Sequence, residues 1–301
     1  MLTTQVVTGL AEGGAYALMA VAIVLVFSGT RVLSLAIGEM GAFGLLLGLK
    51  WDRTGVPLVH WHPSANLAGP FAMLLAIVCG AILGVVVERF IMRPVEDRSP
   101  ASKLVVTLGI ALFLALAEYQ FISTNPQPMG SPLGASGTDQ LHLFGSVVTW
   151  DDVASLGLAI VMAGSMALFL QRTRFGLAVR ATTSNPGVSR LLGIRVARVH
   201  RFTWVVGAAL SALAAAFLSS TSGEIYPLSM TAALLYAMAG AVIGGLDSLG
   251  GAVSGSLLVG ILQGVLAPRF GPTAAIGATL GLVMLVLLAR PRGMFGTVDA
   301  S

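Results

Sequence analysis

Two acidic residues interrupt long apolar stretches, where an ionised carboxylate is energetically costly. Glu39 is the single charged residue of the stretch 32–49, and Glu118 is the single charged residue of 104–122. If such a stretch crosses a bilayer, a charge at its centre costs on the order of 2.5–3.5 kcal/mol, so Glu39 is expected to face other helices or water. Two roles stay open for it: lining or gating a solute passage, or tying helices together as a buried carboxyl group.

The neighbours of Glu39, together with one acidic residue far along the chain, form a candidate pathway. Its members are Ser34, Ile37, Gly38, Glu39 and Asp247. Glu12 and Glu118 lie nearer the ends of their stretches, so both are expected at a wetted interface. Neither Glu39 nor Asp247 has an evident basic partner, which weighs against the paired charges that ion-coupled carriers use.

A second group of residues is typical of a docking segment. Asn185 is a suitable N-cap, Pro186 suits the first helical position, and Gly193 suits the end of the helix. One apolar face of this short helix would carry Val188, Leu191 and Leu192, with Arg190 beside it. Such a helix between two apolar stretches is expected to lie on lipid headgroups or to dock into a groove of a partner. A basic loop that only fixes orientation is the alternative.

The composition shows which elements must position these residues. Of the 301 residues, 56% are hydrophobic and 10% are charged, against about 25% charged in soluble domains. The apolar runs are continuous rather than alternating, which indicates helices and excludes a barrel. Nine runs approach the roughly 20 residues that a span needs: 13–30, 32–49, 67–87, 104–122, 153–170, 202–223, 225–246, 248–268 and 270–289. We therefore expect one all-α polytopic domain over residues 1–301, with about 8–10 transmembrane or re-entrant helices.

The charges of the connecting loops indicate on which side of the membrane each loop is expected to lie. Loop 171–202 contains seven Arg and no acidic residue, whereas loop 123–152 contains no Lys or Arg. If the segments alternate, 14 of the 17 basic residues fall on one side, which predicts that side to be cytoplasmic. The N-terminus is then outside and the C-terminus inside. Within the external loop, residues 140–149 are expected to form a hairpin, and whether 225–268 holds two spans or a re-entrant pair stays open.

The sequence lacks the residues that several kinds of catalysis and binding would require. There is no G-x-x-x-x-G-K-[ST] phosphate-binding loop, and the spans contain no nucleophile–base pair or metal-ligand set. Cys79 is expected to be a buried structural thiol. The net charge of +4 reports topology rather than nucleic-acid binding. We expect no enzyme activity, no metal, no cofactor and no nucleic-acid partner.

Several segments, in order along the chain, resemble branched-chain amino acid ABC transporter permeases, specifically the first, smaller permease of the pair. The segment Gly9–Leu18 and the pair Gly38-Glu39 resemble the start of that family. In the basic loop the matching residues are Gly176, Arg180, Ala181, Asn185, Leu192, Gly193 and Ile194. The segment 241–252 is similar to the family's glycine-rich break, and 290–296 is similar to its C-terminal signature.

The resemblance implies a role and a set of partners. Loop 171–202 would hold the coupling helix that contacts an ATPase, through Gly176, Arg180, Ala181, Asn185, Val188, Arg190, Leu191, Leu192 and Gly193. The chain would form a translocation pathway with a homologous permease in a bacterial inner membrane. Two cytoplasmic ATPase subunits and an external solute-binding protein would complete an importer of branched-chain or other hydrophobic amino acids.

The sequence also departs from the family. Members commonly read Asn-Phe-Ala-His-Gly-Glu where this chain reads Ser34 to Glu39, and losing the Asn and His removes two polar groups from a segment expected near the pathway. A different or more apolar substrate is therefore open. An importer of urea or short amides is one alternative, and an ion-coupled secondary transporter is the alternative from a different class.

Overall fold

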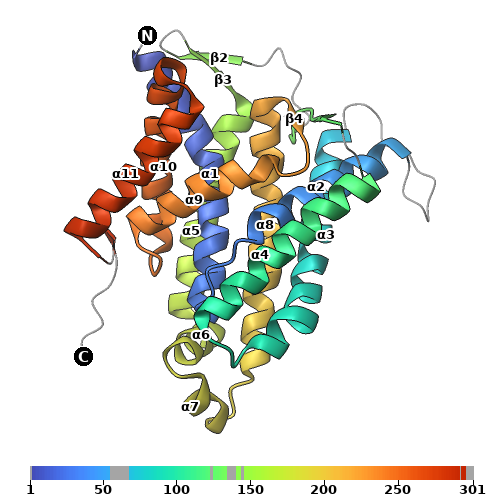
Figure 1. The fold of residues 1–301 in the computed structure, drawn as a ribbon, viewed down its shortest axis with the longest axis vertical. Coiled ribbons are helices and arrows are strands. Elements are labelled where there is room, and N and C mark those ends of the chain that lie inside the picture. The colour runs from blue at the N-terminus through green and yellow to red at the C-terminus, as the bar shows by residue number, and fades with distance from the viewer. Residues whose placement is uncertain are drawn as a thin grey trace.

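The computed structural model describes residues 2–54, 68–122, 125–133, 140–143, 146–291 and 293–295. Almost all of them are helical (Figure 1). The long helices are α1 (Leu2–Thr30), α2 (Ile37–Thr54), α3 (Ala68–Val86), α4 (Pro100–Ala117), α5 (Trp150–Arg172), α8 (Val196–Ser222), α9 (Ser229–Gly244), α10 (Leu249–Phe270) and α11 (Pro272–Ala289). The shorter ones are α6 (Arg174–Ser184) and α7 (Pro186–Leu191). Two π-helical turns, η1 (Val87–Met92) and η3 (Glu118–Ile122), and the 3-10 turn η2 (Arg93–Val95) extend α3 and α4.

Each of the nine predicted apolar segments is a helix, which confirms the all-α polytopic fold. In the described part of the chain, seven helices are long and apolar enough to cross a membrane. The other two are α2, which ends in a charged segment, and α9, which has 16 residues. At 1.5 Å per residue α9 is roughly 24 Å long, short of the roughly 30 Å hydrocarbon core. The segment 225–268 therefore folds as a short helix followed by a full-length one.

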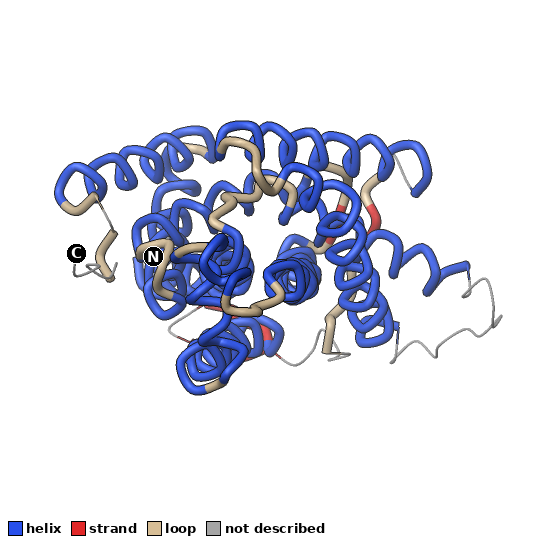
Figure 2. Tube along the Cα trace, turned by 90° about the horizontal axis from the view of Figure 1, so that it is seen from below, coloured by secondary structure: helices blue, strands red, loops and turns tan. Residues whose placement is uncertain are grey.

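Helix α1 is the centre of the bundle. It packs against α10, α8, α5 and α9, and every residue from Ala15 to Val26 is buried. A helix that is apolar on all sides belongs in an interior, and α1 has no charged residue between Gly13 and Thr30. Seen along the bundle, some helices appear nearly end-on while others lie across them (Figure 2).

Glycines bring α10 into backbone contact with two neighbours. On one face, Gly260 and Gly264 lie against Gly9, and a Cβ on Gly260 would overlap the Gly9 carbonyl oxygen. On the other face, Gly251 and Gly255 lie against α9 at Gly244 and Gly240. Small residues permit this approach between membrane helices, so close packing accounts for most of this glycine-rich region.

The chain breaks between α9 and α10 and is capped there by the C-terminal segment. Gly245 has φ +104°, and the last carbonyls of α9 would otherwise lack partners. The Met294 N–H donates to Ile243 O at 2.8 Å, and the Phe295 N–H donates to Gly244 O at 3.0 Å. Gly293, with φ +80°, lies so close to Gly245 that a Cβ would come within 2.7 Å of its backbone.

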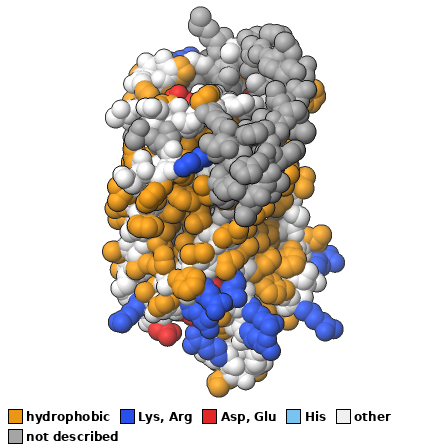
Figure 3. All heavy atoms as spheres, turned by 90° about the vertical axis from the view of Figure 1, so that its right-hand side faces the viewer, with side chains coloured by type: hydrophobic (Ala, Val, Ile, Leu, Met, Phe, Trp, Pro, Cys, Tyr) orange, Lys and Arg blue, Asp and Glu red, His pale blue; other side chains and the backbone are white. Residues whose placement is uncertain are grey.

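The two ends of the bundle differ. At the end where α1 begins, strands β2 (Gln140–Leu143) and β3 (Ser146–Thr149) form the predicted antiparallel hairpin. Strand β1 (Gln127–Pro128) pairs there with β4 (Glu224–Ile225). Helices α6 and α7 form the opposite end (Figure 1). On the face in Figure 3, hydrophobic side chains cover the middle and Lys and Arg gather below them, towards the α7 end.

We expect Gly260→Ala to destabilise the fold, because the added methyl group meets the backbone of α1 rather than a movable side chain. Overpacking of this kind costs about 1–3 kcal/mol. Thermal denaturation of the detergent-purified protein would measure the loss. Gly277→Ala in α11 is the matched control, since its Cβ would meet nothing within 4 Å. Equal stability of the two variants would contradict the contact between α1 and α10.

Candidate functional sites

The structure brings four of the five predicted pathway residues together in the interior. Ser34, Ile37 and Glu39 are at most 2% exposed, and Gly38 lies against Leu234 and Met230 of α9. The Thr231 hydroxyl donates to Glu39 Oε1 at 2.9 Å. Glu39 Oε2 and the Ser34 hydroxyl have no hydrogen-bond partner among the described residues. Glu39 is thus a half-satisfied carboxyl group between α2 and the start of α9.

Glu118 is buried, so the expectation that water wets it was wrong. Its exposed fraction is 0%, and neither carboxyl oxygen has a partner in the described part of the chain. It opens the π-helical turn η3, which packs against α2. A π-helical turn changes the direction of side chains relative to a regular helix. Two carboxyl groups without a cationic partner, Glu39 and Glu118, therefore lie on neighbouring elements.

Asp247 does not join the Glu39 group. It lies beyond the C-terminal end of α9, whereas Thr231 and Glu39 are at the N-terminal end of that helix. The expectation that Asp247 has no basic partner was also wrong, because Arg31 Nη1 is 2.7 Å from Asp247 Oδ1. Both side chains are nearly half exposed, so the pair stabilises the fold little. It joins the α1–α2 connection to the α9–α10 break.

Two clefts that the sequence did not indicate lie at the end of the bundle where α1 begins. Both are lined by Glu12, Tyr16 and Tyr236. One, of about 280 Å³, is completed by the end of α8, β4 and the start of α9; the other, of about 240 Å³, by α10. The Tyr16 hydroxyl donates to Glu12 Oε2 at 3.4 Å, and the two tyrosine rings are 5.3 Å apart. Glu12 therefore borders a cavity rather than simply ending a span.

The basic loop folds as its residues predict. The Asn185 side chain accepts from the Val188 N–H at 3.0 Å and begins α7, with Pro186 in its first turn. Gly193 follows the helix with φ +80°. The exposed apolar residues are Val188 at 50%, Leu191 at 89% and Leu192 at 74%. These three residues form an exposed apolar tip on and directly after α7, which lies at one end of the molecule (Figure 1).

Helix α6 and the side chain of Arg190 hold this tip in place. Gly176 is packed against the Leu170 backbone, so α6 turns sharply away from α5. The Thr183 hydroxyl donates to Ser28 O at 2.6 Å, which fastens α6 to the end of α1. Arg180 is exposed and Ala181 is half-buried. Arg190 forms an ion pair with Glu96, its Nη2 lying 2.7 Å from Glu96 Oε1.

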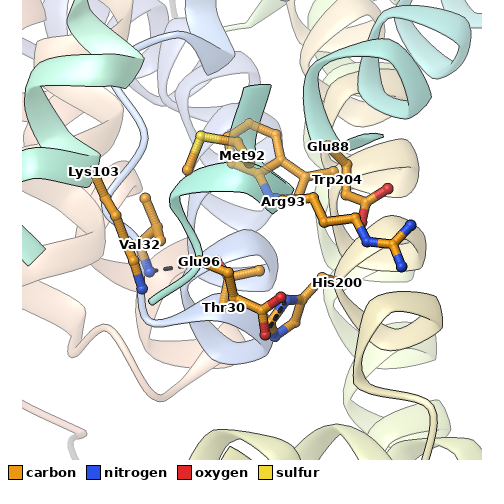
Figure 4. Close-up of a pocket in the computed structure, with 9 residues that line it drawn as sticks. All are labelled: Thr30, Val32, Glu88, Met92, Arg93, Glu96, Lys103, His200 and Trp204. Carbon is orange, nitrogen blue, oxygen red and sulfur yellow. Dashed lines mark hydrogen bonds and ion pairs between the residues drawn. The ribbon is translucent and has the colours of Figure 1, made fainter. Parts of the chain in front are cut away.

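A small pocket lies between the α1–α2 connection, the turns that extend α3 and the start of α8 (Figure 4). Arg190 pairs with Glu96, which is one of the residues that line this pocket. Glu96 also contacts His200, with Nδ1 3.7 Å from Oε1. Glu88, which is 2% exposed, accepts from Arg201 Nε at 3.0 Å. In the described residues no group of three or more His, Cys, Asp or Glu side chains could hold a metal ion. This network connects α7 to the ends of α3 and α8.

The bundle of long apolar helices defines a polytopic membrane protein. The family described as "Branched-chain amino acid transport system / permease component" matches residues 5–289. The chain belongs to this family, which comprises transport permeases rather than enzymes.

Individual relatives are similar to this chain over most of its length. The high-affinity branched-chain amino acid transport system permease protein BraD of Pseudomonas aeruginosa is 29% identical, over 97% of this chain and 95% of its own. LivH of Escherichia coli strain K12, with the same description, is 27% identical over 97% and 94%. The fructose import permease protein FruG of Bifidobacterium longum is 27% identical over 88% and 76%. No solved structure matches the chain.

We expect Glu39→Gln to leave the protein folded and assembled, because the amide oxygen can accept the same hydrogen bond from Thr231. If Glu39 lines the pathway, the loss of its carboxylate changes the transport rate. Solute uptake by cells, normalised to the amount of protein in the membrane, is the measurement. A variant that no longer accumulates in the membrane would instead show that Glu39 ties helices together.

Glu118→Met is expected to stabilise the protein. An unsatisfied buried polar group costs about 1–3 kcal/mol, and methionine fills the same space without needing a partner. Glu118→Gln is the control, since it keeps the unsatisfied group and gains nothing. Thermal denaturation in detergent measures both variants. A loss of stability in Glu118→Met would mean that the carboxyl group has a partner outside the described residues.

Proposed function

We propose that this chain is the membrane-spanning subunit of an ATP-driven ABC importer for branched-chain or other hydrophobic amino acids. It forms the translocation pathway with a homologous permease in a bacterial inner membrane. Two cytoplasmic ATPase subunits bind at the α7 end, and a solute-binding protein delivers the solute at the other end. The names of the relatives, permeases of branched-chain amino acid transport systems, support the substrate class.

The single observation that carries the proposal is the apolar tip of α7. Leu191 and Leu192 are 89% and 74% exposed on a helix that is capped at both ends and fastened to its surroundings through Arg190. Exposed leucines on a rigid support fit a groove in a partner. A loop that only fixed orientation would need its arginines but not this apolar face.

The same end of the molecule supports a proposed orientation in the membrane. The arginines of loop 171–202 surround the tip, and basic loops stay in the cytoplasm. We infer that the α7 end and the C-terminus face the cytoplasm, and that the β2–β3 hairpin and the N-terminus face outward. The ATPases then meet α7 directly. ATP binding and hydrolysis shift α7, and the bundle alternates between outward-open and inward-open states.

We expect Leu191→Asp to abolish co-purification of the ATPase subunit with this chain in mild detergent, because a carboxylate replaces the most exposed leucine of the tip. Ser184→Asp is the matched control: it introduces the same charge at an exposed position at the end of α6. Leu191 makes few internal contacts, so the variant should reach the membrane in normal amounts.

The co-purification experiment also separates the classes of transporter. Loss of the ATPase in Leu191→Asp but not in Ser184→Asp supports the proposal. Equal retention of the ATPase in both variants would mean that the ATPase binds another surface of this chain. Absence of any ATPase with the wild-type protein would overturn the ABC mechanism and return attention to ion-coupled transport through Glu39.

A further inference from the structure

The acidic residue that the two clefts share has no strong hydrogen-bond partner among the described residues. Glu12 lines both clefts, and among the described residues its only hydrogen bond is the long one from Tyr16, at 3.4 Å. The nearby Asp151 and Asp152 are occupied: Asp151 accepts from Ser131 and Ser220, and Asp152 accepts from Thr149 and Thr221. Glu12 thus has lone pairs that can receive a ligand.

The charged side chains among the described residues that line the clefts are all acidic. No Lys, Arg or His is among the described residues that line either cleft, whereas Glu12 and the exposed Glu224 are. Asp152 lies near enough to Glu12 to interact with it electrostatically. No described residue forms an ion pair with Glu12. A cavity with carboxylates and no internal cation attracts a cationic group from solution.

The walls of the clefts suit an amino group on an apolar solute. The rings of Tyr16 and Tyr236 pack against each other with centroids 5.3 Å apart and planes tilted by 55°, and both residues line the clefts. Tyrosine rings attract ammonium groups. Leu218, Met230 and Ala233 supply apolar surface in the larger cleft. Its volume of about 280 Å³ is on the order of ten water molecules, enough for a small amino acid.

We propose that Glu12 receives the cationic amino group of the transported solute, beside the rings of Tyr16 and Tyr236 in the clefts that these three residues line. This inference rests on the proposed function and narrows its substrate class. Solutes with an ammonium group enter the clefts. Urea and short amides, which carry no positive charge, gain nothing from Glu12. The residue is therefore a specificity determinant on the outer half of the pathway.

The test uses the complete importer reconstituted in vesicles, with its solute-binding protein kept saturated so that every variant receives the same delivery. The probes are labelled L-leucine and labelled urea, and uptake is divided by the ATP hydrolysed. We expect Glu12→Gln to lower leucine uptake per ATP at least ten-fold while the ATPase rate stays within two-fold. Glu224→Gln removes an exposed charge at the same cleft and should lower leucine uptake per ATP by no more than about three-fold, because only Glu12 lies beside the two tyrosine rings.

Two further variants keep the test decisive if Glu12→Gln assembles poorly. Glu12→Asp retains the charge and should restore leucine uptake to within about three-fold of wild type. Tyr236→Leu removes one ring and should lower it at least three-fold. Wild-type uptake in Glu12→Gln, or an equal loss in Glu12→Asp and Glu12→Gln, would overturn the role of Glu12.

The wild-type importer separates this inference from the proposed function. ATP-dependent uptake of urea but not of leucine would leave an ABC permease and overturn the ammonium site. No ATP-dependent uptake of either probe would overturn the proposed function, and the inference with it.

Discussion

The close approach of α10 to both α1 and α9 is the contact on which the rest of the structure depends. In hydrocarbon there is no hydrophobic driving force between helices, so van der Waals packing and hydrogen bonds must hold the bundle together. Glycines on two faces of α10 allow backbone to meet backbone on both sides. Because α1 carries Glu12 and Tyr16 while α9 carries Tyr236, the position of α10 also sets the width of the clefts that these residues line.

The polar groups of the interior are of two kinds: those paired within the protein and those without a partner among the described residues. At the α9–α10 break, the C-terminal segment supplies N–H donors to the free carbonyls of Ile243 and Gly244, so an irregular turn persists inside protein. Glu39 and Glu118 keep unpaired oxygens. Native proteins rarely leave such groups without a reason. Their position, between α2, α4 and the start of α9, marks the region where a second chain, a solute or a movement of the helices would supply what is missing.

Local features of this protein could be predicted from its sequence, whereas contacts between distant elements could not. Apolar runs and capping residues act within a few positions, which is why the nine helical segments, the hairpin and the ends of α7 were predicted correctly. The Arg31–Asp247 pair joins residues 216 positions apart, and no local pattern reveals it. Glu118 was misplaced because the sequence gives its depth in the span but not the face to which a π-helical turn directs it. The sequence did not indicate that Glu12 lines a cleft, because that cleft is formed by four separate segments. The roles of the predicted pathway and coupling residues stay predictions.

Helix α1 joins the two ends of the proposed transport cycle. Glu12 lies in the first half of α1, and Ser28, whose carbonyl accepts from Thr183 of α6, lies 16 residues further along, or roughly 24 Å at 1.5 Å per residue. Between them α1 is buried on all sides, so it cannot bend without disturbing its packing against four other helices. If an ATPase displaced α6 and α7, as the proposed function requires, the displacement would therefore reach the clefts beside Glu12 as a movement of the whole helix rather than as a local distortion. The glycine contacts with α10 would then have to slide or separate, which places the adjustable part of the bundle at the interface between α1 and α10.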